Sequence, residues 1–238
     1  MILVILIIRF AIPLVNRLPG DTRPGGCQDP GTVVKRHMVA SILARLRDHL
    51  PQEPAPPVPA PDLVPAGVLV PLFVQEEALR VLFTQRTLLV KDHRGQIAFP
   101  GGVQDPGDAH LLATALRETD EEIGLAPEAV EVLGTLPGIA TITGYHITPF
   151  VGLIPYPYDF HPSPQDVKRL LAMPVAEFYA PERWRAGPYT FQGRTTRVCY
   201  WHNGQEVVWG ATARILLNLL AHLGVHPIPG DRDATCLD

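Results

Sequence analysis

The 238-residue sequence predicts one α+β domain, an α/β/α sandwich in which a mixed β-sheet has flanking helices. Short β-rich runs follow a proline-rich stretch, a central segment has apolar residues at helical spacing, and a second helical segment closes the domain. Strands, helix, strands and helix in that order are typical of an α+β or α/β sandwich. The length favours a single domain with appended ends.

Residues 1–37 are expected to be an extension that contributes little to the fold, either disordered or not translated. An apolar run covers residues 2–8, but Arg9 interrupts it and Pro13 follows. The run is far shorter than the roughly 20 residues that span a bilayer. It also lacks the basic start and small-residue cleavage site of a secretory signal. No membrane association is expected.

Residues 38–65 are expected to form an N-terminal helix and a Pro-rich linker. Met38 opens an amphipathic segment at 39–50 and is a candidate start of the protein. Proline and alanine dominate residues 51–65, and such a composition favours extended geometry over a helix.

The folded domain is expected to cover residues 66–224, with 225–238 as a C-terminal tail. Its first two strands are the β-rich runs 67–74 and 78–84. The polar residues Gln75–Glu77 separate them, which is a hairpin signal.

Residues 111–123 repeat apolar side chains at helical spacing and predict a helix. Asp108 is expected to cap its N-terminus, and Gly124 to end it in the left-handed conformation. Further strands are expected at 130–136, 147–154 and 197–202. A last amphipathic helix is expected at 209–223.

Charge and cysteine content restrict the partners. A formal net charge of -4 gives no basic surface for a nucleic acid, so a small-molecule partner is expected and a homodimer is left open. Cys27, Cys199 and Cys236 lack the spacing of a zinc site or a redox pair. They are expected to be free thiols in a reducing compartment, the cytoplasm.

The helix at 111–123 carries the candidate metal site. Glu118, Glu121 and Glu122 stand at i, i+3 and i+4, so the three carboxylates share one stripe and repel one another. Mg²⁺ or Mn²⁺ would compensate, because hard divalent ions bind carboxylate oxygens and bridge them to substrate phosphates. Arg117 lies four residues before Glu121 and can orient it. The alternative is an ordinary solvated acidic face.

The stretch from Gly102 to Leu125 resembles the Nudix box, G-x5-E-x7-R-E-U-x-E-E-x-G-U, where U is bulky and apolar. Asp108 stands in place of the first glutamate, one additional residue precedes Arg117, and Thr119 occupies the first U. The resemblance implies the Nudix fold and pyrophosphate hydrolysis. It also implies that Arg117 and the three glutamates are the catalytic residues, with the glutamates as metal ligands and Glu118 as candidate base.

The preceding stretch, Leu82 to Gly102, resembles the signature of coenzyme A pyrophosphatases, L-L-T-x-R-[SA]-x3-R-x3-G-x3-F-P-G-G. Its spacings agree throughout, although Lys91 replaces an arginine. This resemblance implies hydrolysis of coenzyme A to 4′-phosphopantetheine and adenosine 3′,5′-bisphosphate. The implied substrate-binding residues are Arg86, Lys91, Arg94, Gly101 and Gly102.

Two other functions stay open at this point. The chain could be a Nudix hydrolase of ADP-ribose or another nucleoside diphosphate derivative, with a fortuitous upstream signature. It could also be a non-catalytic nucleotide-binding Nudix module, although such a module would be expected to lose metal carboxylates. A substrate panel and a manganese titration separate these hypotheses.

Overall fold

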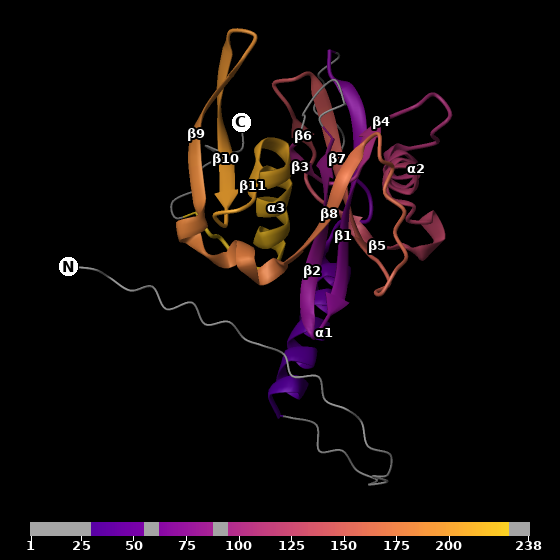
Figure 1. Cartoon of the computed structure of the whole chain (residues 1–238), viewed down its shortest axis with the longest axis vertical. Helices are drawn as coiled ribbons and strands as arrows, with labels where there is room; N and C mark the ends of the chain where they lie inside the picture. The colour runs from indigo at the N-terminus through magenta and orange to yellow at the C-terminus, as the bar shows by residue number, and fades with distance from the viewer. Residues whose placement is uncertain (1–29, 55–61, 88–94, 229–238) are drawn as a thin grey trace, which may run out of the picture.

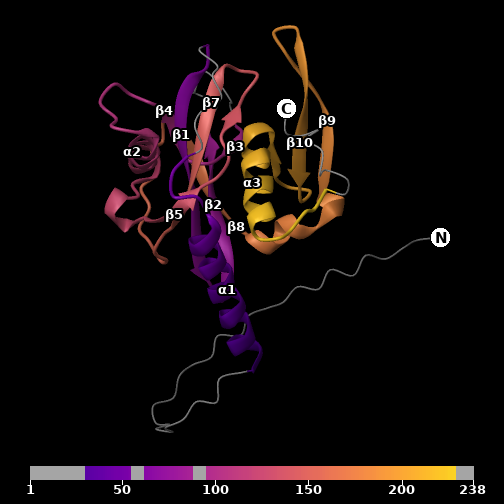
Figure 2. The same ribbon diagram turned by 180° about the vertical axis from the view of Figure 1, so that it is seen from behind.

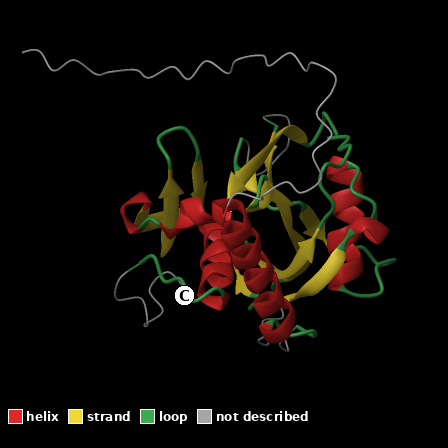
Figure 3. Ribbon diagram, turned by 90° about the horizontal axis from the view of Figure 1, so that it is seen from below, coloured by secondary structure: helices red, strands yellow, loops and turns green. Residues whose placement is uncertain are grey.

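A computed structural model describes residues 30–54, 62–87 and 95–228. Its centre is an eight-stranded mixed sheet with helix α2 on one side and helices α1 and α3 on the other (Figures 1 and 2). A separate three-stranded sheet lies beyond α3. The predicted mixed sheet with flanking helices is therefore confirmed, and Figure 3 shows helices on either side of the strands.

The central sheet has the strand order β3-β2-β1-β7-β5, with β4 on β1, β6 on β7 and β8 on β2. Among the strand pairs of the described residues, only that of β1 with β7 is parallel. The strands are β1 (Val64–Gln75), β2 (Ala78–Arg86), β3 (Ile97–Ala98), β4 (Gly101–Val103), β5 (Glu131–Thr135), β6 (Ile139–Ala140), β7 (Tyr145–Leu153) and β8 (Val167–Pro174).

Strand β1 shows why the sheet is covered on both faces. Leu69 and Phe73 pack in the cluster that includes α2, whereas Val70 and Leu72 pack in the cluster that includes α1 and α3. Alternate residues of a strand point to opposite faces, so a strand buried on both faces is apolar throughout. The predicted hairpin is present, with Glu76 and Glu77 at positive φ between β1 and β2.

Helix α2 spans Leu111–Ile123 and lies close to the central sheet. Its contact with β1 depends on Gly67, because a Cβ there would stand 2.2 Å from the Leu111 carbonyl oxygen. Gly124 ends the helix at φ 69°, in the left-handed conformation that the sequence predicts.

The other face is covered by α1 (Pro30–His49) and α3 (Gly210–His222). Helix α1 is longer than expected and begins before Met38. Its buried residues Leu43 and Leu46, and Leu50 directly after its end, join the core formed with α3. Part of the expected linker, 55–61, lies outside the described residues.

The small sheet contains β9 (Trp184–Phe191), β10 (Arg194–His202) and β11 (Val207–Trp209). Only part of β10 was expected from the sequence. Trp184 and Trp201 are cross-strand partners and are buried on the α3 side of this sheet. The short 3-10 helices are η1 (Pro127–Ala129), η2 (Val175–Tyr179) and η3 (Pro181–Arg183).

Two further expectations bear on cysteine chemistry and membranes. Cys199 of β10 is disulfide-bonded, so the expectation of three free thiols is wrong. The spacing of cysteines along a chain does not show which of them approach one another in the fold. Cys27 and Cys236 lie outside the described residues. Within the described part of the chain, no helix is long and apolar enough to cross a membrane.

Candidate active site

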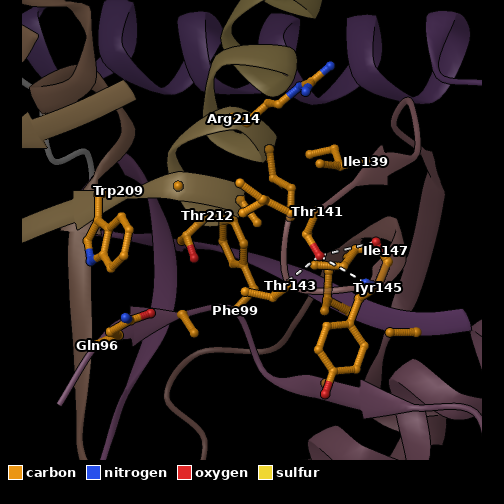
Figure 4. Close-up of a pocket in the computed structure, with 18 of the residues that line it drawn as sticks. Gln96, Phe99, Ile139, Thr141, Thr143, Tyr145, Ile147, Trp209, Thr212 and Arg214 are labelled. Carbon is orange, nitrogen blue, oxygen red and sulfur yellow. Dashed lines mark hydrogen bonds between the residues drawn. The ribbon is translucent and has the colours of Figure 1, made fainter. Parts of the chain in front are cut away.

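A cavity of about 950 Å³ lies between the carboxylate stripe of α2 and the small sheet. Strands β3, β4, β6 and β7 and the first turn of α3 also contribute to its lining. Figure 4 shows the Trp209 indole on one side of this cavity and Tyr145 on another. The cavity is thus wide enough to extend from the predicted metal residues to an aromatic wall.

The three predicted glutamates of α2 all line this cavity but differ in burial. The side chain of Glu121 is 61% exposed, that of Glu118 is 22% exposed and that of Glu122 is 9% exposed. Helical spacing places them on one stripe, and the curvature of the helix surface turns Glu122 toward the sheet and Glu121 toward solvent.

Arg117 holds the outer part of the stripe together. Its Nη1 lies 3.0 Å from Oε1 of Glu118 and donates to Oε2 of Glu121 at 3.2 Å, as the i, i+4 spacing predicts. Its Nε and Nη2 both donate to Asp108 at 3.0 Å. These paired charges hold the pKa of Asp108 well below its usual range.

Asp108 does not cap α2, which corrects the sequence expectation. His110 is the N-cap, and its Nδ1 accepts from the Ala113 backbone N–H at 3.1 Å. Asp108 accepts instead from Arg117, from the Thr114 hydroxyl and from the Asp105 backbone N–H. The N-cap therefore stands two positions after Asp108, whose carboxylate orients Arg117 instead.

Among the three glutamates, Glu122 is the most buried, and it has a strongly raised pKa, as is common for catalytic carboxylates. Burial raises its pKa from 4.5 to about 7, although Arg86, whose Nη1 stands 3.6 Å from Oε1, opposes the shift. Oε2 of Glu122 and Nε of Arg86 are buried and have no hydrogen-bond partner among the described residues. At the base of the cavity, a carboxylate oxygen of Glu122 and a guanidinium nitrogen of Arg86 thus both lack a hydrogen-bond partner among the described residues.

Gly101 and Gly102 bring the chain of β4 against these carboxylates. A Cβ at Gly102 would stand 2.4 Å from the carboxyl carbon of Glu118, so the absence of a side chain lets Glu118 lie against the strand. Gly101 has φ 146° and would place a Cβ 2.4 Å from the Gly67 carbonyl oxygen. Burial raises the pKa of Glu118 as well, with Arg117 opposing.

The residues fit a divalent cation held together with a substrate. Among the described residues no three acidic, histidine or cysteine side chains converge into a preassembled metal group. Arginines hold all three glutamates: Arg117 pairs with Glu118 and Glu121, and Arg86 with Glu122. The unsatisfied oxygen of Glu122 is nevertheless a suitable ligand, and Mg²⁺ commonly takes one or two protein carboxylates plus substrate phosphates.

Of the predicted substrate-binding cations, one lines the cavity and two lie outside the described residues. Arg86 lines the cavity, whereas Lys91 and Arg94 lie outside the described residues. Sequence reasoning missed Asp166, which follows β7 in a loop and lines the cavity with the glutamates. It accepts from the Ser163 hydroxyl at 2.9 Å and contributes to the raised pKa of Glu122. An isolated aspartate in a loop has no spacing signal that would have identified it.

Comparisons with known proteins agree with this geometry. A NUDIX domain family model matches residues 64–191, more than half of the chain. The uncharacterized Nudix hydrolase NudL of Klebsiella pneumoniae subsp. pneumoniae is 41% identical over 162 residues, which cover 68% of this chain and 84% of that protein. NudL of Escherichia coli O1:K1 / APEC is 40% identical over the same length and shares.

Among solved structures, a MutT/nudix family protein from Enterococcus faecalis superposes with a TM-score of 0.44 and 14% identity. It covers 84% of this chain and 81% of its own. The family match and the NudL relatives show that the chain belongs to the Nudix family. It is a pyrophosphatase, and Nudix hydrolases generally need divalent metal ions and act on small nucleotide derivatives.

Proposed function

We propose that the chain hydrolyses the pyrophosphate bond of coenzyme A and its derivatives. The products are 4′-phosphopantetheine, or its acyl form, and adenosine 3′,5′-bisphosphate. One observation carries the proposal: the arginine of the upstream signature, Arg86, lies against Glu122 of the Nudix box with a buried and unsatisfied Nε. The two motifs therefore meet at one point in the cavity. A diphosphate bound there would accept from Arg86.

The size of the cavity supports a large substrate. At about 950 Å³ it lies near the upper end of the roughly 300–1,000 Å³ found for small-molecule sites. Coenzyme A carries a pantetheine arm and a 3′-phosphoadenosine on either side of its diphosphate. A diphosphate near Glu122 would leave space for both ends, toward β7 and toward the small sheet.

We assign the cation to Glu118, Glu121 and Glu122, and propose Mg²⁺ or Mn²⁺. The bound ion would neutralise the diphosphate and lower the pKa of an attacking water. Arg117 keeps Glu118 and Glu121 in place, Gly102 leaves room for Glu118, and Arg86 neutralises charge on the diphosphate. Glu118 is the candidate base within the box, and Asp166 is a second carboxylate that could take the proton.

We also propose that the enzyme works in the cytoplasm, where coenzyme A is abundant. The disulfide at Cys199 argues for a more oxidising location, because disulfides are rare in the cytosol. Because Cys199 is buried, acid quenching of cells followed by thiol alkylation in denaturant distinguishes the two locations: labelled Cys199 would support the cytoplasm, and protected Cys199 would contradict it.

A substrate panel tests the proposed reaction. The panel includes coenzyme A, an acyl thioester, ADP-ribose, NADH and nucleoside triphosphates, each with Mg²⁺, Mn²⁺ or EDTA, and identifies products by mass. Metal-dependent release of adenosine 3′,5′-bisphosphate is expected. A Glu122→Gln variant should not release it, which excludes a contaminating hydrolase. Turnover of ADP-ribose alone would contradict the proposal.

A further inference from the structure

The far wall of the cavity comes from the small sheet, most of which lies outside the matched Nudix segment 64–191. Trp209, the last residue of β11, and Tyr189 of β9 both line the cavity, with ring centroids 5.1 Å apart. Tyr200 stacks parallel to Trp209, with ring centroids 6.0 Å apart and an interplanar angle of 11°. The Trp209 indole thus lines the cavity and is held in place by contacts with two tyrosines.

The strand register places a cation on the same face as these rings. Thr196 is the cross-strand partner of Tyr189, and Tyr200 is the partner of Trp209, so the even-numbered residues of β10 share the aromatic face. Arg194 belongs to this face, two residues and roughly 7 Å beyond Thr196. It lines the cavity, is exposed, and has no ion pair or hydrogen bond within the described part of the chain.

The opposite end of the cavity is lined mainly by aliphatic and threonine side chains, with Tyr145 among them. Strands β6 and β7 and the turn between them contribute Ile139, Ile142 and Ile147. This side suits an uncharged arm, whereas a flat ring next to a free guanidinium suits a nucleobase that carries a phosphate nearby. Arg86 is already committed to the Glu122 end, so a second phosphate group needs a different cation.

We propose that the aromatic face of the small sheet, formed by Tyr189, Trp209 and Arg194, is the subsite for the 3′-phosphoadenosine half of the substrate. The adenine packs in the angle between these two rings, whose planes are 60° apart, and the 3′-phosphate accepts from Arg194. This assignment rests on coenzyme A being the substrate. The small sheet would then be the part of the protein that selects coenzyme A over a nucleoside diphosphate without the 3′-phosphate.

Calorimetric titration of the full chain in EDTA tests the subsite without turnover. Adenosine 3′,5′-bisphosphate and AMP are the two probes, and they differ only in the 3′-phosphate. Wild-type protein should bind the bisphosphate more tightly. Arg194→Ala should weaken bisphosphate binding roughly ten- to a hundredfold, as expected for a lost charged hydrogen bond, and leave AMP binding unchanged. Equal affinities of wild-type protein for both probes would overturn the phosphate assignment.

Arg185→Ala is the matched control, because Arg185 lies in the same sheet and has the same charge but does not line the cavity. It should bind both probes as the wild type does; losses equal to those of Arg194→Ala would show a general charge effect and overturn the assignment. Trp209→Leu should weaken both probes alike, and Trp209→Phe should keep most of the affinity. Since Trp209 immediately precedes α3, Tyr189→Ala is a second variant that tests the same stacking if Trp209→Leu does not fold.

Two combinations of results separate this inference from the proposed reaction. Arg194-dependent binding of the bisphosphate without hydrolysis of coenzyme A would support the subsite and contradict the reaction. Hydrolysis of coenzyme A with unchanged probe binding in both Arg194→Ala and Tyr189→Ala would support the reaction and overturn the subsite.

Discussion

Replacing Glu122 by glutamine should change how the stability of the metal-free protein depends on pH. The folded protein raises the pKa of this carboxyl from 4.5 to about 7, because burial disfavours the charged form more than Arg86 favours it. The group therefore contributes stability that is fully present below pH 4.5 and is lost as the pH rises through 7. The whole change corresponds to about 3 kcal/mol, at 1.36 kcal/mol for each pH unit. Glutamine has the same shape but does not titrate.

Urea denaturation in EDTA at pH 5 and pH 8 measures this effect. The free energy of unfolding should fall between the two pH values by about 2.5 kcal/mol more in the wild type than in Glu122→Gln, because part of the whole change lies below pH 5. Mn²⁺ at pH 8 should then stabilise the wild type and have little effect on the variant, because a ligand that binds only the folded state raises its stability. Equal pH dependence in the two proteins would refute the burial argument.

Four other outcomes follow from the site and its supports. Glu118→Gln should reduce kcat by at least tenfold with an unchanged circular dichroism spectrum, and wild-type turnover would remove Glu118 from the site. Gly102→Ala should also lower kcat because its Cβ would displace the Glu118 carboxylate, whereas Gly107→Ala, with no atom within 4 Å of the added Cβ, should be neutral in the same assay. Asp166→Asn should lower kcat more than it raises KM, and the reverse pattern would make Asp166 a binding residue. A chain that starts at Met38 should keep full activity. It should lose less than about 1 kcal/mol of stability in urea denaturation, because the ion pair that it loses, Arg36–Glu77, lies at the surface. Aggregation of this shorter chain would show that the first turns of α1 belong to the domain.

The sequence predicted those parts of the fold that have strong local signals. Helix α2 has the predicted bounds, because apolar periodicity and Gly124 mark them. The hairpin between β1 and β2 is marked by Glu76 and Glu77 between two apolar runs. The glutamate stripe and the contact of Arg117 with Glu121 follow from helical geometry alone.

The features that escaped prediction depend on contacts distant in sequence. Asp108 was predicted to cap α2, but its carboxylate accepts from Arg117, which lies nine residues later in the sequence. Strand β9 contains Gly187 and Pro188, which weaken a strand pattern, and only its pairing with β10 defines it. Trp209 was expected to belong to the last helix, but it ends β11, stands at the N-cap of α3 and lines the cavity.

Competition between coenzyme A and ADP-ribose tests the proposed substrate most directly. Both compounds are supplied at equal concentration to one preparation with Mg²⁺, and mass spectrometry follows the two sets of products over time. The ratio of initial rates then equals the ratio of kcat/KM values, independent of enzyme concentration. Adenosine 3′,5′-bisphosphate and 4′-phosphopantetheine should form faster than AMP and ribose 5-phosphate. Faster release of AMP and ribose 5-phosphate would contradict the assignment of coenzyme A.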